Sequence, residues 1–516
     1  MTKIKNYFFL CVFVTFSFST FGQTYKLDNV ENFRSNGIKP VKTEGGIVGY
    51  TIFYKTDKAD RKNDNYAFEL LDEKLKKVNR IKVVLPRGTR LIQSVHNGIS
   101  LGMMFYNTSG GKYIFKSYDA TLKLVGSYES EKINSYERAA LNHMADNESS
   151  TFYGIHAIPM KGFVRAGYGE KKDQFSVTVF DVNFKKKWVY QTPEKQDGLE
   201  TFVMSDINDK YITGLTMRRK GITSLKFEYF LTVFDFETGK KLIDVSAEKQ
   251  KENLSISATN LLDNDQLLVL GEYYDAEDKA GVSKSNGIYF KKFDIKTGKA
   301  TNEIKLSWKV DIKKMFNQNG MKRIEENYSN FPMSLIRSAN GHTYLIYEQY
   351  RRAVDGVGLA ISALGGSASI AKLKIGDLWM LELDENYKPL NVNYYIKESS
   401  NVILPEGANF FGTGFLGMYA KNTGEFDYQF TQQSADKRTF NVAYVNYDRE
   451  EGEKSKPIVA GIFMSDDGKI NYDKVDITVP KKTYQYLYPG PGNSIMLAQY
   501  NYKEEVINLK LIKMNY

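Results

Sequence analysis

The chain has 516 residues, a formal net charge of +10, 42% hydrophobic residues and 14% aromatic residues. This composition predicts a folded chain with a large core and excludes a disordered polyelectrolyte. The only cysteine, Cys11, lies within the first 22 residues, so the rest of the chain has no disulfide, no thiolate metal site and no cysteine nucleophile.

Residues 1–22 are typical of a cleavable secretory signal. Lys3 and Lys5 form a basic start, "YFFLCVFVTFSFS" is a short apolar run, and Thr20 and Gly22 are small residues before a cleavage site. We therefore expect export to the periplasm, the cell surface or the medium, with no transmembrane segment after cleavage. Export argues against a nucleic-acid partner, and the basic charge favours an anionic glycan or an envelope protein as partner.

One pattern recurs along the chain: an alternating apolar run, an aspartate and a short polar turn that often ends in lysine. Two clear copies are "LTVFDFETGKKL" from Leu231 and "YFKKFDIKTGKA" from Tyr289. Alternation with period two predicts a strand with one buried face, and aspartate at a turn accepts hydrogen bonds from nearby backbone N–H groups. The aspartates of the predicted hairpins are Asp72, Asp119, Asp181, Asp235, Asp294, Asp384 and Asp448.

Strand-like runs also precede the hairpins, as in "SATNLLDNDQLLVLGEYY" from Ser257. Two strands plus a hairpin make a four-stranded blade, so we predict an all-β chain with one β-propeller domain of about seven blades over residues 23–516. If "TYKLDNV" pairs with the strands of "NSIMLAQYNYKEEVINLKLIKM", an eighth, composite blade closes the ring and protects its edges. A pair of β-sandwiches and two smaller propellers stay open as rival folds.

The turns at 235–240 and 294–299 are similar to the hydrophobe-Asp-x-x-Thr-Gly-Lys turn of quinoprotein-type propeller blades, which related exported scaffold propellers share. The tryptophan that commonly follows in those blades is present once here, as Trp188. Neither a full cofactor set nor a tandem-cysteine feature accompanies the turns. The resemblance therefore supports a propeller, and we expect no quinone or other cofactor.

Three segments interrupt the strand pattern. Residues 129–149 and 309–328 have apolar residues at helical spacing and predict short helices in loops between blades. The third segment, 353–377, is an insert in the blade of the Asp384 hairpin, and it has no charged residue from Gly356 to Ala371. It is either a loop that touches lipid or a partner, or a small-residue insert packed over the blade edge, and we prefer the second.

Motifs for catalysis and metal binding are scarce. The four histidines, His96, His143, His156 and His342, are far apart in sequence. The acidic runs "LDNDQ" and "YYDAEDK" lack the glycine and terminal glutamate of a calcium loop, and "SDDG" from Ser465 predicts a hairpin turn. The sequence thus predicts no catalytic residue and no metal ligand, but carboxylates far apart in sequence leave a glycosidase open.

Tyrosines followed by charged residues recur where the second strand of a blade is expected to end. In a propeller the loops from second to third strands emerge on one face, where tyrosine and arginine suit a sugar ring and its carboxylate or sulfate. The alternative is structural, because tyrosine is a favoured strand residue. The candidate ligand-binding residues are Tyr54, Tyr106, Tyr168, Arg218, Arg219, Tyr273, Tyr347, Tyr350, Arg351 and Arg352.

Two functions follow from these patterns. The first is an exported, non-enzymatic binding or scaffold propeller that recognises a glycan or protein partner through this loop face. The second is a carbohydrate-active hydrolase or lyase with carboxylates in the central pocket. The few histidines and the regular repeat favour the first.

Overall fold

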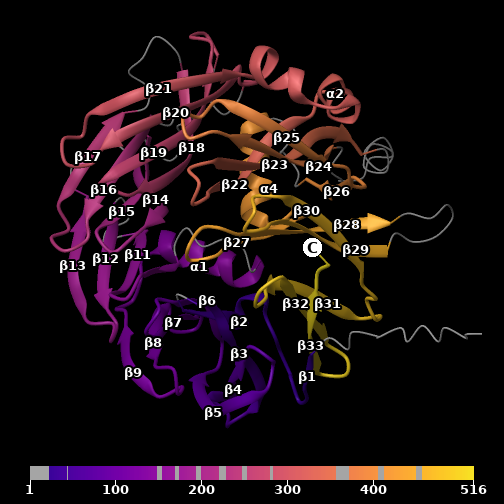
Figure 1. The fold of residues 1–516 in the computed structure, drawn as a ribbon. Coiled ribbons are helices and arrows are strands. Elements are labelled where there is room, and N and C mark those ends of the chain that lie inside the picture. The colour runs from indigo at the N-terminus through magenta and orange to yellow at the C-terminus, as the bar shows by residue number, and fades with distance from the viewer. Residues whose placement is uncertain are drawn as a thin grey trace, which may run out of the picture.

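The computed structural model describes residues 23–515, except for residue 44 and the segments 148–153, 169–173, 193–198, 220–227, 247–252, 279–282, 356–370, 405–411 and 449–455. The predicted signal, residues 1–22, lies outside these described residues. Eight antiparallel sheets follow one another around a ring, from indigo to yellow in Figure 1. The molecule is therefore an all-β propeller, as expected, and it has eight blades.

The first four blades are regular sheets whose strands pair in chain order. Blade 1 contains β2 (Ile38–Thr43), β3 (Gly46–Lys58), β4 (Asn63–Asp72) and β5 (Lys77–Pro86). Blade 2 contains β6 (Thr89–His96), β7 (Leu101–Asn107), β8 (Lys112–Tyr118) and β9 (Leu124–Glu129). Blade 3 contains β10 (Ile155–Ile158), β11 (Gly162–Tyr168), β12 (Phe175–Asp181) and β13 (Lys186–Gln191). Blade 4 contains β14 (Leu199–Ile207), β15 (Tyr211–Arg219), β16 (Glu228–Asp235) and β17 (Lys241–Ser246).

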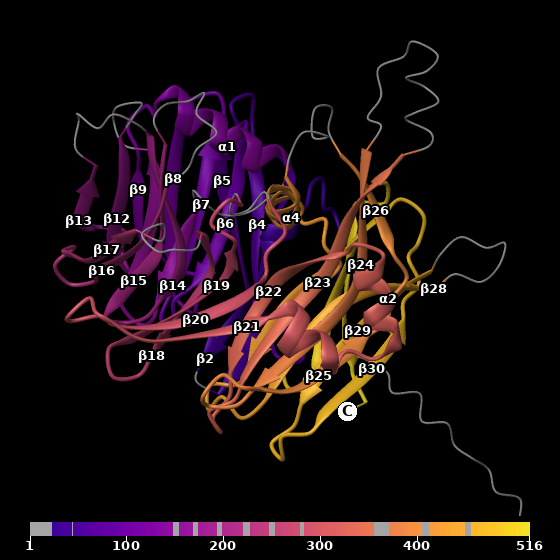
Figure 2. The same ribbon diagram turned by 90° about the horizontal axis from the view of Figure 1, so that it is seen from above.

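Blades 5 to 8 keep the pattern with two variations, an added strand in blade 6 and a composite blade 8. Blade 5 contains β18 (Asn253–Leu262), β19 (Gln266–Tyr274), β20 (Gly287–Asp294) and β21 (Ala300–Ser307). Blade 6 contains β22 (Ser329–Arg337), β23 (Thr343–Val354), β24 (Ala371–Leu383) and β25 (Pro389–Tyr395), and β26 (Ser400–Ile403) pairs with the start of β24 (Figure 2). Blade 7 contains β27 (Tyr428–Gln433), β28 (Phe440–Asp448), β29 (Lys456–Met464) and β30 (Ile470–Asp476). Blade 8 contains β31 (Thr483–Pro489), β32 (Ser494–Asn501), β33 (Val506–Lys513) and β1 (Thr24–Leu27).

Blade 8 closes the ring by joining the two ends of the described chain. In the β1–β33 pair Tyr25 lies opposite Leu509 and Leu27 opposite Ile507. Leu27 and Val30 are buried in a cluster that also holds Ile507. The composite eighth blade predicted from the sequence is confirmed, and it removes the open edges that an unclosed ring would have.

The core lies between adjacent blades. The first strands of neighbouring blades contact one another and form the inner ring, as β2 does with β6 and β14 with β18. Between blades 1 and 2, Phe53 and Phe105 pack with ring centroids 5.3 Å apart, and Phe68 and Tyr118 pack at 5.0 Å. Aromatic contacts of this kind stabilise the interface beyond the burial of their area.

The aspartate turns join third to fourth strands and also pin the blades together. The carboxylate of Asp181 accepts hydrogen bonds from the backbone N–H groups of Asn183 at 2.8 Å and Lys185 at 2.9 Å. In this turn Phe184 has a φ of +59° and is buried against the preceding blade. The Asp235 turn uses Gly239 for the positive φ instead, and its buried residue is Phe236. Each turn therefore inserts one apolar side chain between two blades.

The prediction that Asp448 begins a turn between third and fourth strands is wrong. Asp448 is the last residue of β28, the second strand of blade 7, and lies opposite Lys456. The turn from third to fourth strand in this blade is formed by 465–469, where Gly468 has a φ of +78° and Ser465 N–H donates to the Lys469 carbonyl oxygen at 3.0 Å. Asp448 matches the repeat in sequence because a strand and a polar turn flank it, but the turn is on the opposite face.

Short helices lie in the connections between blades. Within the described ranges they are η1 (Ser35–Gly37), α1 (Ser135–Asn147), η2 (Trp308–Ile312), η3 (Lys313–Met315), α2 (Gln318–Glu325) and α4 (Thr413–Thr423). The helices predicted in 129–149 and 309–328 are confirmed, the second as three short pieces. The ends of the predicted 353–377 insert continue β23 and β24, and 356–370 lie outside the described residues.

Candidate functional site

A cavity of about 1260 Å³ lies against the inner strands β14, β18 and β22 of blades 4, 5 and 6. Its wall is completed by residues 283–286, by the connection 308–316 and by α4. We call it the central cavity. The loop at 283–286 joins second to third strands and the connection joins consecutive blades, so both reach it from the face on which the sequence predicts ligand binding.

Helix α4 is held beside the central cavity by its apolar side. Leu416 and Ala420 are buried in the core, whereas Met418 and Lys421 line the cavity. The hydroxyl of Tyr350 donates to the carbonyl oxygen of Thr413, the first residue of α4, at 2.9 Å. A Cβ at Gly417 would lie 2.7 Å from that hydroxyl oxygen, so only glycine permits this close approach.

The lining of the central cavity combines hydroxyl, amide and aromatic groups. The side-chain hydroxyl of Thr259 bonds those of Ser205 and Thr213, the second at 3.0 Å. The other polar and aromatic lining residues include Tyr229, Ser255, Ser257, Asn260, Tyr274, Asn286, Trp308, Phe316, Ser329 and Asn330. Flat rings beside groups that both donate and accept hydrogen bonds suit a hydroxyl-bearing ligand.

Three of the four lysines in the lining give the central cavity a positive rim. Lys284 and Lys309 are exposed and Lys313 is half-buried. Among the described residues no carboxylate lies within ion-pair distance of these three amines. Their charge is therefore directed to the solvent and to whatever enters the cavity.

Two carboxyl groups of the lining are partly desolvated. Glu272 accepts hydrogen bonds from the hydroxyls of Tyr274 at 2.8 Å and Ser285 at 3.1 Å, and Trp308 Nε1 donates to Ser285 at 2.9 Å. Burial raises the pKa of Glu272, although the two hydroxyls oppose the shift. Burial also raises the pKa of Asp206, which accepts the backbone N–H of Leu261.

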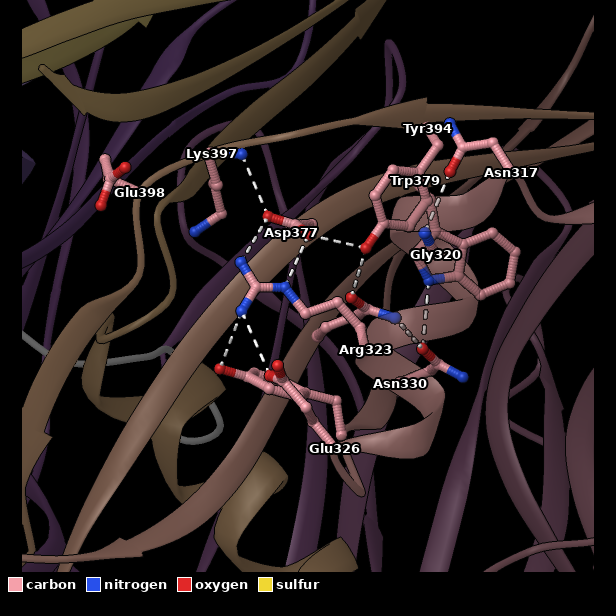
Figure 3. Close-up of polar contacts among 12 residues, drawn as sticks. Asn317, Gly320, Arg323, Glu326, Asn330, Asp377, Trp379, Tyr394, Lys397 and Glu398 are labelled. Atoms are coloured by element: carbon pink, nitrogen blue, oxygen red, sulfur yellow. Dashed lines mark hydrogen bonds and ion pairs between the residues drawn. The ribbon is translucent and has the colours of Figure 1, made fainter.

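A hydrogen-bonded network behind the cavity fixes blade 6 and α2. Figure 3 shows Asp377 of β24 between Arg323 of α2 and Tyr394 of β25, with Arg323 Nε at 2.8 Å and the Tyr394 hydroxyl at 2.7 Å. Burial lowers the pKa of Arg323, but the hydrogen bond and charge of Asp377 outweigh burial and raise it. Asn330, which lines the cavity, accepts the Trp379 Nε1–H at 3.1 Å. The inner wall is thus tied to a rigid support.

A second cavity of about 1010 Å³ lies between blades 8, 1 and 2. Tyr66, Tyr486 and Tyr500 line it, and so do Thr423 and Gly424 at the end of α4. Two of its basic groups pair with carboxylates of the lining, Lys55 with Glu31 at 2.8 Å and Arg90 with Asp146. Helix α4 therefore contacts both cavities.

The sequence-predicted candidates lie on the second strands of six blades, as expected, but four of the tyrosines point into the core. Tyr54, Tyr106, Tyr347 and Tyr350 are each 3% exposed or less. Tyr347 stacks on Trp379 with ring centroids 4.5 Å apart. Tyr350 lines the central cavity and Tyr54 lines the second one.

The other candidates are nearer the surface and spread around the ring. Tyr168 and Tyr273 are half-buried, and Arg352 is exposed. Arg218 pairs with Glu200 and Asp244, both at 3.0 Å. Arg351 donates to the Glu326 carbonyl oxygen at 3.1 Å, and the side chain of Arg219 lies outside the described residues. The fold does not bring these residues into one cluster, and their ligand-binding role stays a prediction.

Sequence reasoning missed the residues that the fold does bring together. Lys309 and Lys313 belong to a segment that was predicted only as a helix, and α4 was not predicted at all. The signal that was present is the lysine-rich run 309–314 beside Trp308. Within the described residues no group of three or more His, Asp or Glu is arranged to hold a metal ion, and no helix there is long and apolar enough to cross a membrane.

The protein is an eight-bladed β-propeller, and its central cavity is a pocket on the inner wall with lysines at the rim. Residues 1–515 match the family of unknown function DUF6770, and the chain belongs to that family. No curated protein matches the sequence.

Solved structures with a similar fold share about a tenth of their sequence with this chain. One of two prolyl endopeptidases is 10% identical over 88% of this chain, with a TM-score of 0.38, and this chain spans 54% of its length. The WD40 domain of SCAP from fission yeast is 9% identical over 92% of this chain and 97% of its own, with a TM-score of 0.34. A polysaccharide lyase, the PL25 ulvan lyase, is 10% identical over 94% of this chain and 96% of its own, with a TM-score of 0.36. Likenesses this distant say nothing about activity.

Proposed function

We propose that the protein is an exported, non-enzymatic binding or scaffold propeller, and that its central cavity takes an anionic, hydroxyl-bearing ligand such as an acidic glycan. The observation that carries the proposal is the set of three lysines, Lys284, Lys309 and Lys313, at a cavity lined by hydroxyls and aromatic rings. The amines attract carboxylate or sulfate, the rings stack on sugar faces, and the hydroxyls exchange hydrogen bonds with the ligand.

Each lysine is expected to contribute only a small part of the binding free energy. An ion pair at the solvent-exposed edge contributes about 0.2–1 kcal/mol. Removing two such contacts therefore weakens binding by roughly 2- to 30-fold in Kd. Salt screens these contacts over about 8–10 Å at moderate ionic strength, so binding weakens as salt is added.

Calorimetric binding to a panel of acidic and neutral glycans at low and moderate salt tests the proposal. The variant combines Lys309→Ala with Lys313→Ala, and Lys314→Ala is the matched control because Lys314 is a neighbouring exposed lysine outside the lining. We expect salt-sensitive binding of acidic glycans that the double variant weakens and the control does not. Equal affinity of the double variant and the wild type would refute the cavity as the site.

The loop face predicted from the sequence is a competing location for the same ligand. Replacing Arg351 and Arg352 with alanine tests it, because Arg352 is exposed near the end of β23. If only the Arg351 and Arg352 variant loses binding, the binding site lies on the loop face and not in the central cavity. Absence of binding to every glycan of the panel would instead favour an envelope protein as the partner.

A carbohydrate-active hydrolase or lyase is the second candidate function. Asp206 and Glu272 favour it, because burial raises the pKa of both carboxyl groups in the central cavity and a raised pKa suits a general acid. Chromatography of each bound glycan after incubation distinguishes the two functions. A shortened or unsaturated product that Glu272→Gln or Asp206→Asn abolishes would establish the enzyme.

A further inference from the structure

A lysine with a fully buried side chain lies between blades 6 and 7 together with two carboxylates. Lys397 follows β25, and its side chain is 0% exposed. Its Nζ lies 2.7 Å from Glu348 Oε1 and also contacts Asp427 Oδ2. Lysine is almost never fully buried in proteins unless it is paired, and here two carboxylates pair with it.

Each of the three groups is held in place by further hydrogen bonds. The backbone N–H of Lys397 donates to Asp377 at 3.0 Å, which joins it to the network in Figure 3. Glu348 accepts the backbone N–H groups of Asp427 at 3.3 Å and Tyr428 at 3.0 Å. The Asp427 carboxylate accepts the Ser400 hydroxyl at 2.9 Å, so hydrogen bonds as well as charges fix its position.

Such fixed contact supplies the proximity that a reaction between the two groups requires. Groups held at reacting distance reach effective concentrations of about 10⁵–10⁸ M relative to free molecules. Here the Lys397 amine, the Asp427 carboxylate and the Glu348 carboxylate, which can carry a proton, lie together in a buried site that excludes bulk water. Condensation of an amine with a carboxylic acid is disfavoured in water, and exclusion of water removes that obstacle.

Condensation requires a proton transfer inside this cluster before the amine can react. Burial raises the pKa of Glu348, and the Lys397 charge opposes the shift. Burial alone lowers the pKa of Lys397, but the two carboxylates outweigh it and raise the pKa, so the proton transfer costs free energy. Transfer of one proton from Lys397 to Asp427 leaves the total charge unchanged and gives a neutral amine beside a carboxylic acid, a pair that a buried site tolerates.

We propose that Lys397 and Asp427 condense to an intramolecular isopeptide bond, with Glu348 as the catalytic residue that moves the protons. The neutral Lys397 Nζ attacks Asp427 Cγ and forms the C–N bond. Glu348 accepts a proton from Nζ and returns it to the departing oxygen, the C–O bond breaks, and one water molecule leaves. One ammonium and one carboxylate become one amide and one water, so charge and atoms balance without any oxidant or other reactant.

The bond would close the chain from Lys397 to Asp427 into a covalent loop. This loop contains β26 and α4, the helix that lines both cavities. The bond would therefore fasten α4 beside the central cavity and join blade 6 to blade 7. It does not depend on the proposed ligand, since the reacting groups are buried in the protein itself.

Intact-mass spectrometry of the purified, folded wild-type chain in denaturing solvent tests the bond directly. We expect a mass lower by one water molecule than the mass calculated for the purified residues, and a tryptic digest with a branched peptide joining Lys397 to Asp427. Lys397→Arg, Asp427→Ala and Glu348→Gln should each restore the sequence mass. Lys421→Arg is the matched control, because Lys421 is a half-buried lysine near Glu348 that does not contact Asp427, and it should keep the deficit.

The wild-type measurement decides the question even if the variants fail to fold. Chain isolated in denaturant from an insoluble pool should have the full sequence mass and lose one water only after refolding, because the reaction needs the folded geometry. A folded wild-type chain at full sequence mass overturns the proposal. A branched peptide that joins Lys397 to Glu348 overturns the assignment of Asp427 as the reacting carboxylate.

Discussion

Leu27 offers a direct test of how the ring closes. It lies in β1, opposite Ile507 of β33, and is 3% exposed. Its neighbour Lys26 is in the same strand but on its exposed face, where it pairs with Asp28 at 2.8 Å. Replacing each with alanine removes a side chain from the same strand, but only the Leu27→Ala variant takes apolar surface out of the core.

The expected cost follows from the carbon groups that are lost. Leucine has three more carbon atoms than alanine, worth about 2.5 kcal/mol at about 0.8 kcal/mol for each buried group. The cavity left behind adds to this, but an edge strand can shift to fill part of it, so we expect about 3 kcal/mol in total. Lys26→Ala loses only a surface ion pair and should stay within about 0.5 kcal/mol of the wild type.

Urea unfolding followed by tryptophan fluorescence measures the difference. We expect the Leu27→Ala midpoint to fall to lower urea with an unchanged slope, while the Lys26→Ala midpoint stays at the wild-type value. Equal midpoints for the two variants would show that β1 contributes no buried contact, and blade 8 would then be held by β31, β32 and β33 alone.

Three further outcomes are expected. Phe184→Ala removes the buried ring of an aspartate turn, which stacks on Phe163 at 4.6 Å, and should lower the free energy of unfolding by about 3–5 kcal/mol in urea titrations. Tyr350→Phe loses the hydrogen bond to Thr413 and should cost about 0.5–1.5 kcal/mol by the same assay. Asp265 has its pKa lowered to about 2, first by the hydrogen bond from Lys296; its stabilisation is therefore present above about pH 4 and is lost as pH falls through about 2, so Asp265→Asn should flatten the acid limb of the stability–pH profile.

Matched substitutions separate these effects from general damage. Lys185→Ala lies beside Phe184 but is exposed and should change little. Tyr347→Phe should be nearly neutral, because among the described residues nothing bonds the Tyr347 hydroxyl, and a cost equal to that of Tyr350→Phe would contradict the role of the Thr413 contact. Asp263→Asn removes an exposed carboxylate close to Asp265 and should leave the acid limb steep.

The fold was readable from the sequence because its signals are local. Each aspartate turn needs an acceptor, a positive φ and an apolar residue within a few positions, as in Asp235, Phe236 and Gly239. The strands that flank a turn alternate because one face is buried. Closure by residues 24–27 was also predictable, since an unpaired last blade would expose an edge.

The site was not readable because its determinants are distant in sequence. The sequence around a tyrosine at a strand end is the same whether its ring faces solvent or a neighbouring blade. Tyr106, for example, is buried by side chains of blades 2 and 3, and no local sequence pattern reveals this. The same limit explains Asp448, where only strand pairing tells which face a turn occupies. Lys309 and Met418 meet at one cavity although about a hundred residues separate them, and no spacing rule predicts that.

Closure by β1 and β33 also sets an order of events during synthesis. Residues 24–27 leave the ribosome among the first of the described chain, and their partners 506–513 are among the last. At about 5–20 residues per second, β1 waits roughly 25–100 s before its partner exists. Seven blades can pair internally during that time, but the eighth cannot, so an unfinished chain carries an open strand edge at its start. A carrier that shields this strand until synthesis ends would protect the protein from pairing with a second copy.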